Sequence, residues 1–235
     1  SQNMLGDALV FRGEDKAEER WSWDRLREEV SRLQQALAEK GIEPGDRIAA
    51  MMPNMPQTVA LMLAATSLGA VWSSCSPDFG EQGVLDRFGQ IGPKLFIACD
   101  GYWYNGKRQE VVGKARAVAQ NLGVPLLLVP YAGMLSLESA NEADFFHYAD
   151  FIQPYHAQPL RYVRQPFSHP LYILFSSGTT GVPKCIVHSA GGTLLQHLKE
   201  HRFHCELKKG ERLFYFTTCG WMMWNWLVSG LASGA

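Results

Sequence analysis

Apolar positions along most of the chain switch between helical spacing and short continuous runs. Residues 23–37 place their apolar side chains on one helical face, Ser22 can cap the start of this helix, and Gly41 can end it. Short apolar runs then alternate with further helical segments. We expect strands at 48–52, 70–75, 94–99, 124–129, 171–175, 185–188 and 213–217. We expect helices at 56–68, 81–91, 107–121, 193–204 and 221–232.

This order of elements predicts an α/β fold. Apolar strands separated by helices are typical of mainly parallel sheets that helices cover on both faces, so we expect a doubly wound architecture. Residues 131–169 carry little periodicity, and we interpret them as a long surface excursion. Residues 230–235 resemble the exit of a helix toward a strand that does not follow. The 235 residues are therefore expected to be part of a larger domain.

Composition excludes some classes of partner. Hydrophobic residues make up 46% of the chain, and 22 Lys and Arg stand against 23 Asp and Glu, so nothing indicates nucleic acid or an anionic membrane surface. The apolar stretch 59–72 contains Thr66, Ser67 and Gly69 and is too short to span a bilayer. The first residues lack the pattern of a signal peptide, and the five cysteines form no C-x-x-C pair. We therefore expect a cytoplasmic protein.

A loop rich in hydroxyl and glycine residues follows the strand expected at 171–175 and ends in a lysine. Glycines let backbone N–H groups turn toward an anion, hydroxyls add donors, and lysine adds positive charge. The P-loop of common NTPases differs, because here Pro183 precedes the lysine and a strand follows. A plain hairpin turn, the alternative, needs fewer residues. The candidate ATP-phosphate ligands are Ser176, Ser177, Gly178, Thr179, Thr180, Gly181 and Lys184.

This loop resembles the phosphate-binding signature of the acyl-adenylate-forming superfamily, to which acyl-CoA synthetases belong. Other segments match that superfamily in the same order, among them Lys40-Gly-x-x-Pro-Gly-Asp-Arg47 before a strand and Met52-Pro-Asn54 before a helix. Rarer segments narrow the resemblance to the acetoacetyl-CoA synthetase family. They include Trp72-Ser-Ser-x-Ser-Pro-Asp-Phe-Gly80, His188-Ser-Ala-Gly-Gly192 and Gly220-Trp-Met-Met-Trp-Asn-Trp226.

The resemblance implies a ligase that joins acetoacetate to CoA in two steps. The carboxylate attacks the α-phosphate of ATP and diphosphate leaves; the CoA thiol then displaces AMP from the acyl-adenylate. ATP, CoA and Mg2+ are the implied cofactors, and small molecules are the implied partners. Residues 1–235 would form part of the N-terminal adenylation domain. The Thr-Glu and Arg-Thr-Gly-Asp segments of the superfamily are absent from the sequence, so we expect the isolated chain to be inactive and assign no catalytic residue.

The same resemblance assigns two further groups of residues. Trp221, Met222 and Met223 match the segment that lines the acyl pocket and the pantetheine tunnel, where a bulky indole can favour a short acyl chain. Aromatic packing at the start of a buried helix is the alternative for these residues. Lys107 matches basic residues that meet the nucleotide end of CoA, although Tyr104 stands where relatives carry arginine. A solvated lysine that opens a helix is the alternative there.

A different chemistry is conceivable for the helix expected at 193–204. His197, Glu200 and His201 spell His-x-x-Glu-His, the inverted zinc-protease pattern, and two histidines four positions apart share a helix face. An amphipathic helix with a polar face accounts for the same residues, and no separate downstream glutamate helix is evident. A metalloprotease-like protein and a nucleotide-binding module without turnover are thus the alternatives to the ligase. We predict no metal-ligating residue.

Overall fold

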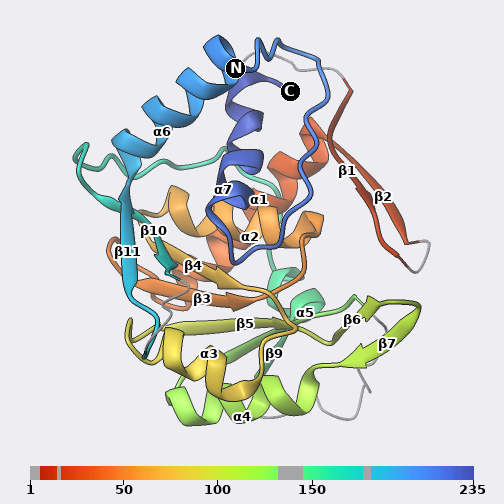
Figure 1. The fold of residues 1–235 in the computed structure, drawn as a ribbon, viewed down its shortest axis with the longest axis vertical. Helices are drawn as coiled ribbons and strands as arrows, with labels where there is room; N and C mark the ends of the chain where they lie inside the picture. Colours follow the sequence, from red (N-terminus) through yellow and green to blue (C-terminus); the bar gives the residue numbers. More distant parts are fainter. Residues whose placement is uncertain (1–5, 15–16, 132–144, 177–180) are drawn as a thin grey trace.

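The computed structural model describes residues 6–14, 17–131, 145–176 and 181–235. At its centre lies a seven-stranded sheet with the order β11-β10-β4-β3-β5-β8-β9, and all neighbouring pairs are parallel except β10 and β11 (Figure 1). The predicted mainly parallel α/β architecture is confirmed. The strands are β3 (Arg47–Met51), β4 (Val71–Cys75), β5 (Leu95–Cys99), β8 (Leu126–Val129), β9 (Phe145–His147), β10 (Pro170–Phe175) and β11 (Cys185–Ser189).

Helices cover both faces of this sheet. Figure 1 shows α3 and α4 on one face and α1 and α2 on the other. Helix α6 packs against β10, β11 and α7. The helices are α1 (Trp23–Glu39), α2 (Pro56–Ser67), α3 (Glu81–Phe88), α4 (Val112–Leu122), α5 (Tyr148–Ile152), α6 (Ala190–Lys199) and α7 (Met222–Ser229). None of the helices in the described ranges is long and apolar enough to cross a bilayer.

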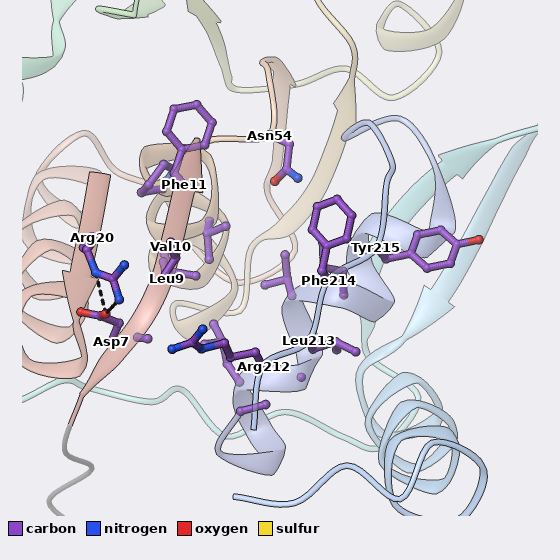
Figure 2. A pocket seen from close by; sticks show the side chains of 18 of the residues that line it. Asp7, Leu9, Val10, Phe11, Arg20, Asn54, Arg212, Leu213, Phe214 and Tyr215 are labelled. Atoms are coloured by element: carbon purple, nitrogen blue, oxygen red, sulfur yellow. Dashed lines mark hydrogen bonds and ion pairs between the residues drawn. The ribbon is translucent and has the colours of Figure 1, made fainter. Parts of the chain in front are cut away.

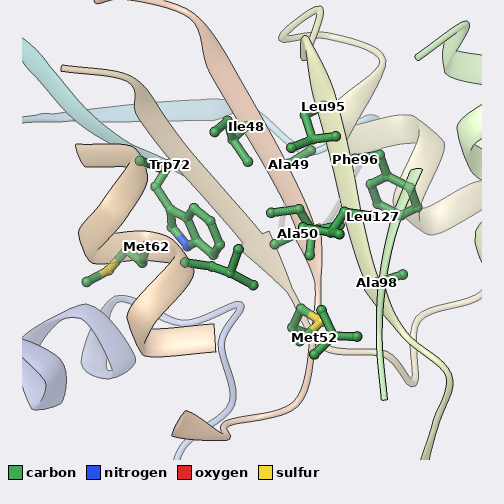
Figure 3. Packing of buried hydrophobic residues seen from close by; sticks show 14 of the residues in the cluster. Ile48, Ala49, Ala50, Met52, Met62, Trp72, Leu95, Phe96, Ala98 and Leu127 are labelled. Carbon is green, nitrogen blue, oxygen red and sulfur yellow. The ribbon is translucent and has the colours of Figure 1, made fainter. Parts of the chain in front are cut away.

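The core is densest around the middle strands. Every residue of β4 and β5 is buried, as expected for strands that have helices on both sides. Figure 3 shows Trp72 of β4 packed between this sheet and Met62 of α2, and Trp72 is only 1% exposed. Burial of each large apolar side chain contributes about 1.5–3 kcal/mol. Because β10 pairs in parallel with β4, this core also fixes the carboxyl ends of both strands side by side.

The first predicted helix forms as its sequence signals indicate. Helix α1 begins at Trp23, and Ser22 caps it, because the Ser22 hydroxyl accepts a hydrogen bond of 3.1 Å from the Arg25 N–H. Gly41 follows the helix with φ at 75°, a conformation that glycine adopts without strain. The predicted helix and both of its end signals are confirmed.

The helix predicted at 107–121 begins later than expected. Residues before it form an antiparallel hairpin of β6 (Gly101–Tyr104) and β7 (Lys107–Glu110), and α4 starts only at Val112. Asn105 and Gly106 form the turn with φ at 52° and 68°, and a two-residue hairpin turn with positive φ at both positions favours Asn-Gly. The prediction that Lys107 opens a helix was therefore wrong.

Three further regions differ from expectation. An N-terminal hairpin of β1 (Asp7–Arg12) and β2 (Glu18–Ser22) was not predicted. In the expected surface excursion, β9 joins the sheet beside β8 and α5 follows it. Near the C-terminus, residues 213–217 pair with no other described segment and form no strand. Helix α6 ends at Lys199 and continues as a π-helical turn over Glu200–His204.

Candidate functional site

The predicted phosphate loop connects the two strands of the hairpin β10–β11. Phe175 pairs with Cys185 across the hairpin. The Ser176 N–H donates to the Lys184 carbonyl over 3.0 Å, and the Lys184 N–H donates to the Ser176 hydroxyl over 3.2 Å. These bonds close the base of the loop. Four of the candidate phosphate ligands lie outside the described residues: Ser177, Gly178, Thr179 and Thr180.

The described part of the loop is open to solvent and held from one side. Gly181 has φ at 97°, which only glycine adopts readily, and both Gly181 and Lys184 are exposed. The side-chain amide of Gln90 donates to the Pro183 carbonyl over 2.8 Å, which ties the end of the loop to the turn after α3. The loop is thus anchored at its base and at Pro183, while Lys184 remains accessible to a ligand.

A cavity of about 200 Å³ opens at the carboxyl ends of β4 and β10, next to this loop. Its wall includes Cys75 and Ser76 after β4, Phe175 at the end of β10, Arg87 of α3 and Trp221. Ligands of parallel α/β sheets typically bind in the crevice outside the carboxyl ends of the strands. The phosphate loop and this cavity therefore share the edge of the sheet where a ligand is expected.

Hydrogen bonds from β4 hold the segment that carries Trp221. The Ser74 hydroxyl donates to the Cys219 carbonyl over 2.7 Å, and the Trp72 indole N–H donates to the Ser74 hydroxyl over 3.1 Å. Both bonds are buried, so leaving either partner unpaired would cost about 1–3 kcal/mol. They fix the backbone just before Trp221, whose indole is 59% exposed at the cavity wall.

The electrostatics of the cavity favour binding of an anion over covalent chemistry by cysteine. The Arg87 guanidinium lies 4.3 Å from the centre of the Phe79 ring, and its Nη1 donates to the Gly83 carbonyl over 2.7 Å. Burial raises the pKa of the Cys75 and Cys219 thiols well above their usual value. Since a thiolate is the reactive form of cysteine, both thiols are inert at neutral pH.

The structure separates the residues assigned to the acyl and pantetheine pocket. Helix α7 begins at Met222, and Trp221 precedes it in an extended conformation. Trp221 therefore faces the cavity at β4, whereas Met222 and Met223 line a second cavity of about 610 Å³ between α6 and α7. Lys107 is exposed on β7 and lines neither cavity.

Three residues at this site carried no signal in the sequence. Ser74, Arg87 and Gln90 act through contacts with segments far away along the chain: Ser74 bonds to a carbonyl 145 positions later, and Gln90 to one 93 positions later. No local pattern encodes such pairs. The topology brings them together because β4 and β10 are neighbours in the sheet.

The His-x-x-Glu-His pattern does not form a metal centre. His197 Nδ1 lies 2.8 Å from the Ser229 hydroxyl, and the Glu200 carboxylate contacts the Gln196 amide and the Lys199 ammonium. Over the described ranges, no group of three or more His, Cys, Asp or Glu side chains could hold a metal ion. The geometry gives the zinc-protease alternative no support.

A third cavity, of about 440 Å³, lies apart from the phosphate loop. Figure 2 shows it between β1 and the extended segment around Phe214 and Tyr215, with Phe11 on the β1 side. At its rim, Arg20 bonds to Asp7 over 2.9 Å. None of the predicted site residues lines this cavity.

Comparison with known proteins agrees with the fold and the site. The family model described as "AMP-binding enzyme" matches residues 3–235. The chain belongs to this family. Acetoacetyl-coenzyme A synthetase of Rhizobium meliloti (strain 1021) is 73% identical over the whole chain, which spans 37% of that protein. Acetoacetyl-CoA synthetase of Mus musculus is 46% identical over 91% of the chain and 33% of the mouse protein.

A solved structure shows the same fold. Acetoacetyl-CoA synthetase from Streptomyces lividans superimposes with a TM-score of 0.90 at 39% identity, over 97% of this chain and 35% of that one. The chain thus spans little more than a third of the length of each of these proteins. The sequence-based resemblance to acetoacetyl-CoA synthetases is confirmed.

Proposed function

We propose that this chain is part of an ATP-dependent acid–thiol ligase that converts acetoacetate, ATP and CoA to acetoacetyl-CoA, AMP and diphosphate. The observation that carries the proposal is the 73% identity, over the whole chain, with a protein named acetoacetyl-coenzyme A synthetase. The open loop on β10–β11 supports it, because Lys184 is available there for a polyanion.

In this proposal the chain binds and orients ATP. Lys184 and the loop amides and hydroxyls hold the β- and γ-phosphates, and each charge-assisted hydrogen bond contributes about 1.5–3 kcal/mol. The acid then attacks the α-phosphate, diphosphate leaves, and the CoA thiol displaces AMP. An anion must approach a polyanion in the first step, so positioning and donors aimed at the developing charge supply most of the catalysis.

The remaining assignments follow from the same reaction. Trp221, Met222 and Met223 would line the path of the acyl group and the pantetheine arm, and Lys107 would meet the nucleotide end of CoA. The described residues contain no cluster of carboxylates fit to hold Mg2+, so this part of the protein does not hold the ion with its own acidic side chains. Five free cysteines fit a reducing compartment, and we place the enzyme in the cytoplasm.

Substrate-dependent ATP–pyrophosphate exchange tests the proposal. The complete polypeptide that contains these residues would be assayed with acetate, butyrate, 3-hydroxybutyrate and acetoacetate. We expect exchange that depends on the added acid and is faster with acetoacetate than with acetate or butyrate. Absence of acid-dependent exchange with every member of the panel would contradict the ligase assignment.

A further inference from the structure

The cavity between α6 and α7 has an apolar wall and a polar wall. Met222, Met223 and Trp226 line it from α7, and Gln196 and His197 line it from α6. Its volume of about 610 Å³ is within the range of small-molecule sites. The arrangement could hold a hydrocarbon segment on one side and a polar group on the other.

The hydrogen bonds of Ser229 fix the proton on the His197 ring. The Ser229 hydroxyl donates its single proton to the Trp226 carbonyl over 2.7 Å. It therefore meets His197 Nδ1, 2.8 Å away, as an acceptor, and Nδ1 must carry the ring proton. Nε2 is then the nitrogen with the free lone pair, on a side chain that lines the cavity.

The surroundings keep this ring uncharged. His197 is only 4% exposed, and burial, followed by the charges of His201 and His188, lowers its pKa to about 4. The opposing influence is Glu200, whose carboxylate is engaged by Gln196 and Lys199. At neutral pH the cavity therefore presents a hydrogen-bond acceptor at His197, which fits a ligand that donates a proton.

We propose that His197 is a specificity-determining residue whose Nε2 accepts a hydrogen bond from a hydroxyl at carbon 3 of the acyl substrate. The inference rests on the proposed ligase function and names its substrate class: 3-hydroxy acids and 3-oxo acids bound as their enols. Met222, Met223 and Trp226 hold the hydrocarbon part. An acid without a donor at carbon 3 leaves the buried acceptor unpaired, which corresponds to discrimination of about 10- to 100-fold.

The test compares kcat/KM in ATP–pyrophosphate exchange for 3-hydroxybutyrate, acetoacetate and butyrate, with the complete polypeptide. In the wild type we expect both oxygenated acids to exceed butyrate by at least about tenfold. His197→Leu should bring both ratios close to unity while butyrate is still used. His204→Leu, an exposed histidine outside the cavity, is the matched control and should leave the ratios unchanged.

Ser229→Ala provides a second, milder variant. Loss of the Ser229 acceptor removes the preference for a proton on Nδ1, so Nε2 is protonated more often and accepts less well. We expect kcat/KM for 3-hydroxybutyrate to fall about 3- to 10-fold, with butyrate unaffected. This variant decides the question if His197→Leu fails to fold.

The outcomes separate the two proposals. If acid-dependent exchange occurs but the wild type shows no preference for an oxygen at carbon 3, or His197→Leu keeps the wild-type ratios, the role of His197 is wrong and the ligase function stands. Unchanged ratios in Ser229→Ala would overturn it if His197→Leu does not fold. Absence of any acid-dependent exchange overturns the ligase function and this inference together.

Discussion

The centre of the sheet and the C-terminal layer of this molecule are built in different ways. Every residue of β4 and β5 is buried, and Trp72 is 1% exposed. In the C-terminal layer, Phe214 and Phe216 are 84% and 90% exposed. The difference teaches that the two regions divide the work. The closed centre fixes where the strands end, and the open layer provides the surfaces at which ligands can bind.

The two regions also differ in how they treat polar groups. In the centre, the Ser73 and Ser74 hydroxyls each donate to a backbone carbonyl over 2.7 Å and tie neighbouring segments together. In the C-terminal layer, the bonds of His197 and Ser229 leave a ring nitrogen directed to ligand chemistry. Polar groups in the centre therefore stabilise the fold, while those in the C-terminal layer are free to select substrates.

The comparison predicts its largest effect at Trp72. Trp72→Ala would leave a cavity among β4, β3 and α2, and we expect the free energy of unfolding to fall by about 3–5 kcal/mol. Phe216→Ala, the matched aromatic control, should change it by less than about 0.5 kcal/mol, because the ring is exposed. Chemical denaturation measures both. Equal losses for the two variants would erase the contrast between the regions.

A pH titration of stability gives the next largest effect. The pKa of His197 is about 4 in the folded chain against about 6.5 when unfolded, so the unfolded state binds the proton more tightly. The stability this group contributes is present above pH 6.5 and is lost as the pH falls from 6.5 to 4. The loss is at most about 3 kcal/mol.

The control for the titration is His197→Gln, which cannot titrate in this range. We expect denaturation midpoints of the wild type to fall more steeply between pH 6.5 and 4 than those of the variant. Identical slopes would show that this ring gains its proton as easily in the folded state as in the unfolded state.

The smallest effect concerns the anchor of the phosphate loop. Gln90→Ala removes the bond to Pro183, worth about 0.5–1.5 kcal/mol, so KM for ATP should rise up to about tenfold. Gln82→Ala is the control, because Gln82 bonds only to Asp86 on the same helix. Steady-state kinetics of the complete polypeptide would measure both. A KM unchanged in Gln90→Ala would mean that the loop does not depend on this anchor.

Local signals in the sequence predicted the elements that depend on local chemistry. The Ser22 cap, the spacing of apolar residues in α1 and the buried runs of β3, β4 and β5 were sufficient to predict these elements within a few residues. The Asn105-Gly106 turn was also present in the sequence. It was overlooked because residues 107–121 as a whole favour a helix.

The rest of the fold and the site depends on contacts between distant segments. The strand β9 exists because β8 offers it an edge, and residues 213–217 form no strand because no described segment pairs with them. The sequence alone placed Trp221, Met222 and Met223 together, but the start of α7 divides them between two cavities. Such divergence follows from backbone direction, which a list of residues does not contain.

The central claim is that the loop closed by Ser176 and Lys184 holds the phosphates of ATP. The most direct measurement is acid-dependent ATP–pyrophosphate exchange by the complete polypeptide with Lys184→Ala, beside Lys208→Ala as an exposed lysine outside the loop. We predict a loss of about 10- to 150-fold in kcat/KM for ATP in Lys184→Ala, with an unchanged unfolding midpoint, and no loss in Lys208→Ala. Full exchange activity in a folded Lys184→Ala variant would contradict the account.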